Sequence, residues 1–504
     1  MASLEARPPA RATRLATWRP CAVLATCLIL AAPLLAEDSP GALYEESLRP
    51  RFHITGRQWE TPRLNPARGE EGWLNDPNGL VYYDGEYHLF AQRWARAWLH
   101  WVSRDLVHWE EISPAFTEAY RWDGVQSGSV VIDGENDSGL GRGDGVAPML
   151  AFYSSGPRVQ PDGTRHATQC LAFSNDRGRT WTKYEKNPVL ADAERDPKVF
   201  RYEPEKKWIM VLYAPPGGYA WYSSRNLLDW EKMSFLPGFY ECPDMFELPV
   251  DGDPGRKKWV VVNGDGSCFV GSFDGTRFTA ESGKQRACFG PDFYATQTFG
   301  GMDDGRRVQM AWLRRGWYPE EFLYHPEMPF SQQMTFPCEL SLRTQHGTIQ
   351  VFRTPIREVA QLHRSERTWE AREMAAGQEV VLAEGRAFHL KMELEMAAQA
   401  EGEIRFRGQT LRFANGKIGV RDKTFTFFGP DRKPQPLTAL ELLLDTTSME
   451  AFANEGEATV AAAFVPEGDT LALACTRGRL TIRKLILWEM GSIWKRASAP
   501  APAE

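Results

Sequence analysis

The sequence predicts an all-β protein in which a five-bladed β-propeller is followed by a C-terminal β-sandwich. A pattern of short strands and tight turns recurs from residue 73 to about residue 345. The spacing of roughly 35 to 60 residues suits propeller blades, which are small sheets packed radially around a channel. A β-rich stretch of different character begins after about residue 355. These observations place the propeller in residues 45–350 and the sandwich in residues 360–495.

Each repeat starts with an acidic or Ser/Gly segment, continues as a short apolar strand, turns, and returns as a strand rich in aromatic residues. A closing segment ending in Trp or Phe follows four of the repeats, so each repeat is predicted to form a four-stranded sheet. The five repeats begin at Trp73, Ser127, Glu194, Glu241 and Asp292.

The C-terminal stretch alternates apolar and polar residues, as in RFRGQTLRFANGKIGV, where Asn415-Gly416 indicates a hairpin. The connection RTPIREVAQLHRS, from Arg353 to Ser365, can form a short helix. The tail of residues 496–504 is rich in Ala and Pro and is predicted to be disordered.

Residues 1–36 have the pattern of a secretory signal peptide. Four arginines between Arg7 and Arg19 precede the apolar run CAVLATCLILAAPLLA, and the acidic pair Glu37-Asp38 follows. The run is shorter than the roughly 20 apolar residues of a membrane span. We therefore expect a secreted or periplasmic protein, with an uncleaved N-terminal anchor as the alternative.

Charge and composition narrow the classes of partner. The 504 residues carry a formal net charge of −7, which provides no positive field for nucleic acid or an anionic membrane. Eighteen Trp residues suit the apolar faces of sugar rings. Outside the signal peptide the cysteines show no CxxC spacing, so neither a metal site nor a dense disulfide framework is indicated. The oligomeric state stays open.

Three of the repeats carry a carboxylate at their start: Asp76, Asp196 and Glu241. The first strand of each propeller blade lines the central channel, so these acids should converge at its mouth although they are distant in sequence. A single surface Asp or Glu is usually a solvated charge or a turn residue. Three at equivalent positions of a repeat indicate a catalytic site.

The motif WLNDPNGL at Trp73–Leu80 resembles glycoside hydrolase family 32, the invertases, levanases and exo-inulinases. Further segments resemble the family in the same order: RPRFHIT, SRDLVHWE, DGVQSGSVV, ERDPKVF, ECPDMFELPVDG, DFYATQTF and SMEAFANEGE. The resemblance covers about residues 49–494 and implies the same propeller and sandwich. It implies a retaining hydrolase that releases terminal fructose from β-fructofuranosides such as sucrose, inulin or levan.

The resemblance also implies roles for individual residues. Asp76 would be the nucleophile, Glu241 the general acid/base and Asp196 the acid that stabilises the transition state. Residues expected to hold the fructosyl ring are Asn75, Gln92, Ser127, Arg195, Tyr294 and Trp312.

The residue types suit this chemistry, because an oxocarbenium-like state needs one carboxylate at the anomeric carbon and one acid at the leaving oxygen. Arg195 is expected to keep Asp196 ionised. No metal or organic cofactor is required for such a reaction.

Three departures from the family lie near the mouth of the channel. Glu194 and Tyr240 replace the residues that often precede the family's Arg-Asp-Pro and Glu-Cys motifs. Only RWARA separates Gln92 from WLHWVS, so a binding Trp of the family has just Trp94 as a candidate counterpart. An insertion, GRQWETPRLNPARGEE, precedes Trp73. The alternatives are a fructosyltransferase using the same acids and a non-catalytic carbohydrate-binding propeller; analysis of the reaction products separates them.

Overall fold

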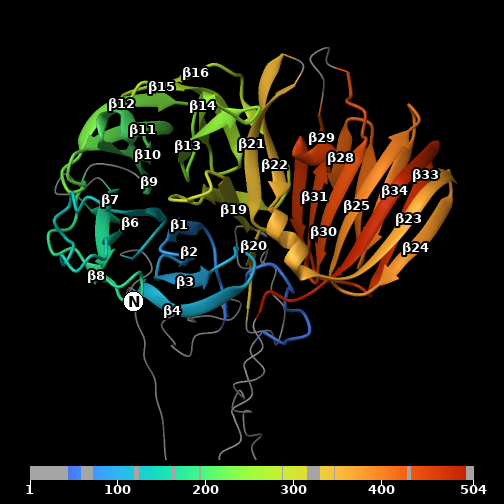
Figure 1. The fold of residues 1–504 in the computed structure, drawn as a ribbon, viewed down its shortest axis with the longest axis horizontal. Helices are drawn as coiled ribbons and strands as arrows, with labels where there is room; N and C mark the ends of the chain where they lie inside the picture. The colour runs from blue at the N-terminus through green and yellow to red at the C-terminus, as the bar shows by residue number, and fades with distance from the viewer. Residues whose placement is uncertain are drawn as a thin grey trace, which may run out of the picture.

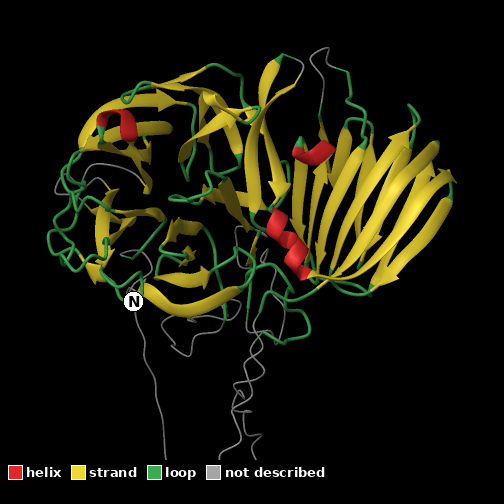
Figure 2. Cartoon of the chain, in the orientation of Figure 1, coloured by secondary structure: helices red, strands yellow, loops and turns green. Residues whose placement is uncertain are grey.

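The computed structural model describes residues 44–57, 72–117, 124–159, 165–191, 195–286, 288–314, 330–345, 347–427 and 433–494. Strands dominate the described chain, as Figure 2 shows, so the predicted all-β class is confirmed. The predicted signal peptide (1–36), the C-terminal tail (496–504) and most of the insertion before Trp73 lie outside the described residues. No helix in the described ranges is long and apolar enough to cross a membrane.

Three antiparallel sheets follow one another along the chain, each with four strands in sequence order. The first contains β1 (Pro77–Tyr83), β2 (Glu86–Arg93), β3 (Ala97–Ser103) and β4 (Trp109–Thr117). The second contains β5 (Gly128–Ile132), β6 (Met149–Val159), β7 (Arg165–Ser174) and β8 (Thr182–Lys183). The third contains β9 (Arg195–Tyr202), β10 (Lys207–Ala214), β11 (Gly218–Ser224) and β12 (Glu231–Pro237), with the 3-10 helix η1 (Glu203–Glu205) in its first turn.

The next strands form one ten-stranded sheet, in which two antiparallel groups are joined where Val250 of β13 pairs in parallel with Leu342 of β21. The first group comprises β13 (Asp244–Val250), β14 (Asp253–Val262), β15 (Ser267–Phe273), β16 (Phe278–Ala280) and β17 (Gln285–Arg286). The second comprises β18 (Phe293–Thr298), β19 (Arg307–Leu313), β20 (Gln333–Met334), β21 (Cys338–Gln345) and β22 (Thr348–Pro355). The count of five blades stays a prediction.

The sheets are arranged around a common centre, and the last group returns to the first (Figure 1). The amide of Tyr82 donates to the carbonyl of Gly300 at 2.9 Å, and the amide of Gly300 donates to the carbonyl of Leu80 at 2.9 Å. Backbone hydrogen bonds therefore join β1 to the segment after β18. Such closure protects strand edges and brings the first strands of successive sheets to the centre.

The remaining strands form two six-stranded sheets packed face to face beside the ring (Figure 1). One contains β23 (His363–Ala375), β34 (Arg479–Met490), β25 (Phe388–Met396), β30 (Ala439–Asp445), β31 (Ser448–Ala453) and β32 (Ala458–Ala463). The other contains β24 (Gln378–Glu384), β33 (Thr470–Arg477), β26 (Glu401–Phe406), β27 (Gln409–Ala414), β28 (Lys417–Val420) and β29 (Lys423–Thr426). The helix considered for the linker is present as the 3-10 helix η3 (Arg357–Leu362), and η4 (Asn454–Gly456) follows β31.

Alternation along the strands explains why these residues form a sandwich. In β25, Leu390, Met392 and Leu394 are buried between the sheets, whereas Lys391 and Glu393 are exposed. This period of two is what a half-buried strand requires, and each buried side chain of this size contributes about 1.5–3 kcal/mol. The Asn415-Gly416 hairpin is confirmed: Ala414 pairs with Lys417, and Gly416 adopts a φ of 65°.

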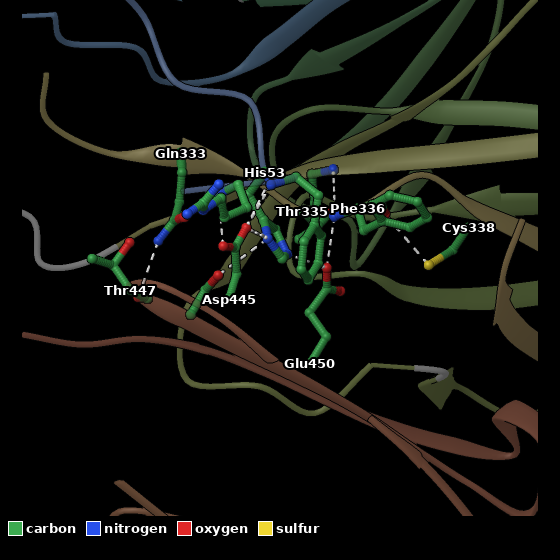
Figure 3. Close-up of polar contacts among 12 residues, drawn as sticks. His53, Gln333, Thr335, Phe336, Cys338, Asp445, Thr447 and Glu450 are labelled. Carbon is green, nitrogen blue, oxygen red and sulfur yellow. Dashed lines mark hydrogen bonds and ion pairs between the residues drawn. The ribbon is translucent and has the colours of Figure 1, made fainter. Parts of the chain in front are cut away.

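The segment before the first strand lies between the ring and the sandwich and is held there by an ionic cluster of His53, Asp445, Glu450 and Arg353 (Figure 3 shows its centre). Asp445 accepts from the amides of Arg51, Phe52 and His53 at 2.7, 2.9 and 3.0 Å. The His53 ring contacts Asp445 at 2.8 Å and Glu450 at 3.1 Å. We call these four residues the interdomain cluster.

The interdomain cluster holds ionised side chains in a fully buried position. Burial disfavours the imidazolium, but the hydrogen bonds to Asp445 and Glu450 outweigh it and raise the pKa of His53 to about 9. Burial would also raise the pKa of both acids, yet His53 lowers that of Asp445, and Arg353 together with His53 lowers that of Glu450. Each charge depends on its partners, since an unpaired buried ion is costly.

This cluster predicts that the protein loses stability as pH rises. His53 has an ordinary pKa of 6.5 and a folded value of about 9, so its contribution is complete below 6.5 and is lost through about 9. The loss should be on the order of 3 kcal/mol in the free energy of unfolding. Urea unfolding at about pH 6 and about pH 9 measures it. His53→Gln should have a lower free energy of unfolding than the wild type at about pH 6, and this free energy should change little up to about pH 9. An equal loss of stability with rising pH in both proteins would show that His53 is not responsible.

Candidate active site

A cavity of about 300 Å³ opens where the first strands of the sheets meet. Eight of the nine predicted site residues line it; the ninth, Ser127, lies behind Asp76. Sequence reasoning did not select Trp73, Ala95, Gln126 or Cys242 for the site, and Trp94, a candidate, is present. The complete lining is Trp73, Asn75, Asp76, Gln92, Trp94, Ala95, Gln126, Arg195, Asp196, Glu241, Cys242, Tyr294 and Trp312.

The backbone at the acids is held in an unusual conformation. Asp196, Glu241 and Cys242 have φ angles of 65°, 44° and 43°, in the left-handed region that non-glycine residues rarely occupy. Each such residue costs on the order of 1–3 kcal/mol, which the surroundings must offset. The amide of Cys242 donates to Asp196 Oδ2 at 3.0 Å, and the amide of Asp196 donates to Ser154 Oγ at 2.9 Å. The strain aims the carboxyl groups into one cavity.

Asp76 is oriented by a short relay of hydrogen bonds. Gln92 Nε2 donates to Ser127 Oγ at 2.7 Å, and Ser127 Oγ donates to Asp76 Oδ2 at 2.6 Å. Asn75 Nδ2 contacts the other oxygen, Oδ1, at 3.4 Å. Burial raises the pKa of Asp76 and the charge of Glu241 raises it further, while the hydrogen bonds from Ser127 and Asn75 lower it. Ser127 therefore positions Asp76 instead of lining the cavity.

Glu241 is held from both sides. Arg195 Nη2 donates to Oε1, and the hydroxyl of Tyr294 donates to Oε2. The Tyr219 hydroxyl donates to the backbone carbonyl of Glu241 at 2.7 Å. The guanidinium of Arg314 lies 4.1 Å from the centre of the Tyr294 ring. The carboxyl group is thus fixed in direction before any ligand enters.

The expectation that Arg195 keeps Asp196 ionised is wrong. Burial raises the pKa of Asp196; Arg195 opposes this, but Glu241 and Asp76 add to the rise, and the result is about 7. Burial is the main reason, and it prevails although Arg195, bonded through Nη2 to Glu241, also places its Nε 3.9 Å from Asp196 Oδ2. At mildly acidic pH Asp196 is protonated.

Tryptophan rings form an apolar wall near Asp76. The rings of Trp73 and Trp94 stack with centroids 4.4 Å apart, and Trp312 meets Trp73 edge-on at 6.0 Å. Asn75 Oδ1 accepts from Trp73 Nε1 and from the amide of Trp94, each at 3.1 Å. The wall could have been anticipated, since Trp73 opens the motif that contains Asp76. An apolar wall facing three carboxyls suits a ligand with apolar faces and hydroxyl edges, as sugars have.

Residues 67–355 match the family model for the glycosyl hydrolases family 32 N-terminal domain. The chain belongs to glycosyl hydrolase family 32. A levanase from Bacillus subtilis (strain 168) is 32% identical, over 93% of this chain and 74% of the levanase. An extracellular exo-inulinase from Aspergillus ficuum is 30% identical, over 90% of this chain and 96% of that protein.

The same relationship appears among solved structures. The crystal structure of an exo-inulinase from Aspergillus awamori superposes with a TM-score of 0.73 at 26% identity, covering 90% of this chain and all of that chain. Family 32 proteins combine a β-propeller with a β-sandwich, so the predicted fold class and family are both confirmed. Like its family, the chain is a glycosidase.

The buried acids predict a carboxyl group in the site that titrates near neutral pH. The resonance of Asp196 in carboxyl carbon-13 NMR should report a protonated group below its pKa of about 7 and an ionised one above it. Comparison with Asp196→Asn identifies that resonance. Asp105 is the control, because hydrogen bonds from His108 and Val107 outweigh its burial and lower its pKa. An Asp196 resonance that stays ionised well below neutral pH would contradict this prediction.

Proposed function

We propose that the protein is a retaining β-fructosidase that hydrolyses terminal fructose from β-fructofuranosides, with Asp76 as nucleophile and Glu241 as general acid/base. The observation that supports this most directly is that both carboxyls line one small cavity, each oriented by its own hydrogen bonds. The names of the relatives, levanase and exo-inulinase, point to fructose polymers as substrates.

In the first step an Asp76 oxygen attacks the anomeric carbon of the fructosyl unit. The bond to the glycosidic oxygen breaks as Glu241 donates its proton to that oxygen. The leaving sugar departs as an alcohol, and a fructosyl ester of Asp76 remains. Ser127, which donates to the free carboxylate, fixes which Asp76 oxygen faces the sugar.

In the second step Glu241, now a carboxylate, takes a proton from water. The oxygen of that water attacks the anomeric carbon, the ester bond breaks, and Asp76 is released as a carboxylate while Glu241 is protonated again. Arg195 and Tyr294 hold Glu241 in both roles. Asp196, lining the same cavity, is placed to hydrogen-bond the sugar hydroxyls while charge develops on the ring.

The size of the cavity favours cleavage at chain ends. Its volume of about 300 Å³ is at the lower limit of ligand pockets, which span about 300–1,000 Å³. Such a pocket suits one terminal sugar, with the rest of the substrate outside the rim. We propose that the protein works outside the cell or in the periplasm, as its extracellular exo-inulinase relative suggests, and that residues 1–36 direct its export.

Removing either carboxylate should abolish turnover while leaving the fold intact. Asp76→Asn and Glu241→Gln are expected to lower kcat by roughly 10³-fold or more, about 4 kcal/mol of barrier. Steady-state release of fructose measures the loss, and thermal unfolding verifies folding. A variant that kept more than about a tenth of wild-type turnover would not have lost its catalytic group.

Product analysis tests the reaction itself. Incubation with sucrose, inulin and levan should release free fructose first, with the β-anomer appearing first in NMR, as double displacement requires. Accumulation of longer oligosaccharides at high sucrose would identify a fructosyltransferase instead. Early α-anomer would mean inversion, and long oligosaccharides released from inulin ahead of fructose would mean internal cleavage.

A further inference from the structure

Tyr240 presents an aromatic ring to solvent directly beside Glu241. It is 54% exposed, and in the described part of the chain only Val381 and Val465 are comparably exposed among the large apolar side chains. Tyr240 does not line the cavity that holds Asp76 and Glu241. The ring therefore stands at the rim, one residue from the proposed acid/base.

The backbone that carries this ring is fixed. The amide of Tyr240 donates to Asn263 Oδ1 at 3.0 Å, and the amide of Gly264 donates to the carbonyl of Tyr240 at 3.3 Å and to that of Glu241 at 3.1 Å. Tyr219 anchors the next peptide through its bond to the Glu241 carbonyl. A ligand that uses the ring would not have to order this loop, which keeps the entropic cost of binding low.

The ring is also supported from the side. Its centroid lies 5.3 Å from that of Tyr213 with an angle of 69° between the planes. The guanidinium of Arg195 lies 5.1 Å from the centre of the Tyr213 ring and bonds to Glu241. Tyr240, Tyr213 and Arg195 form a continuous surface, which we call the acid-side rim, leading from Glu241 to solvent.

We propose that Tyr240, supported by Tyr213, is the platform on which the leaving-group sugar rests, and that it determines the preference for sugar over small leaving groups. This rests on the proposed function, because the acid/base must face the glycosidic oxygen and the leaving group must therefore pass Glu241. The Trp73–Trp94 wall lies instead with Asn75, beside the nucleophile. A rigid Tyr supplies contact area to one face of a sugar ring at little entropic cost.

The hydroxyl of Tyr240 can influence proton transfer by Glu241, and this effect must be separated from stacking of the ring on the sugar. This hydroxyl interacts with the Glu241 carboxyl, whose charge, followed by burial, raises the pKa of Tyr240. Loss of the hydroxyl could alter proton transfer for every substrate. Tyr240→Phe removes the hydroxyl and keeps the ring, whereas Tyr240→Ala removes both.

The experiment compares kcat/KM for sucrose, 1-kestose and methyl β-fructofuranoside, whose methyl leaving group is too small to use the platform. Tyr240→Ala should lower kcat/KM for the two sugars roughly tenfold more than for the methyl fructoside, mainly through KM. Tyr240→Phe should keep the sucrose-to-methyl ratio within about twofold of wild type. Val381→Ala, which removes a side chain 57% exposed in β24, is the matched control and should leave all three values unchanged.

The outcomes separate cleanly. An equal loss on all three substrates, no loss on any, or a Tyr240→Phe ratio as low as that of Tyr240→Ala would each overturn the platform. A wild-type protein that cleaves none of the three fructosides would refute the proposed function itself. Wild-type cleavage with an unaltered ratio in Tyr240→Ala would refute the platform alone.

Discussion

The site depends on the burial of three carboxyl groups in one cavity, where burial opposes their charges and Arg195 contacts Glu241 and Asp196. Burial raises the pKa of Asp196 to about 7, because burial together with the charges of Glu241 and Asp76 outweighs the charge of Arg195, which lowers it. The neighbouring charge of Glu241 also contributes to the raised pKa of Asp76. The cavity therefore tolerates fewer negative charges than it has carboxyl groups. One carboxyl group of the site therefore keeps its proton at a pH at which another is ionised. Acid and base catalysis require such groups in different protonation states.

The rest of the fold maintains this arrangement. The left-handed conformations at Asp196, Glu241 and Cys242 are accompanied by hydrogen bonds that offset their cost, from the amides of Cys242 and Asp196 and to the carbonyl of Glu241. The ring is closed by backbone bonds at Gly300, and it is joined to the sandwich by the interdomain cluster, whose four residues do not line the cavity. The rigid sheets position the carboxyl groups precisely, and the loops at the rim determine substrate specificity.

Much of this could be read from the sequence, because it is encoded locally. Turn residues and alternation mark strands, and a repeat makes equivalent positions meet, which brought Asp76, Asp196 and Glu241 together correctly. What failed depends on the three-dimensional surroundings: the pKa of Asp196 is raised first by its burial, which its adjacency to Arg195 in the sequence does not reveal. The parallel pairing of β13 with β21 was also missed, since it joins residues about 90 positions apart through one pair that leaves no local pattern.

The position of His53 bears on the order in which the chain can fold. Its amide bonds to Asp445, 392 residues later in the sequence, so the segment synthesised early finds its partner only after β30 and β31 exist. Contacts of such long range are slow to form and leave apolar surface exposed meanwhile. During synthesis, the N-terminal segment around His53 can complete this contact only after the strands near Asp445 have been made. The contact can form only when the C-terminal half is present. A chain truncated before β30 would therefore leave His53 without its acidic partners Asp445 and Glu450.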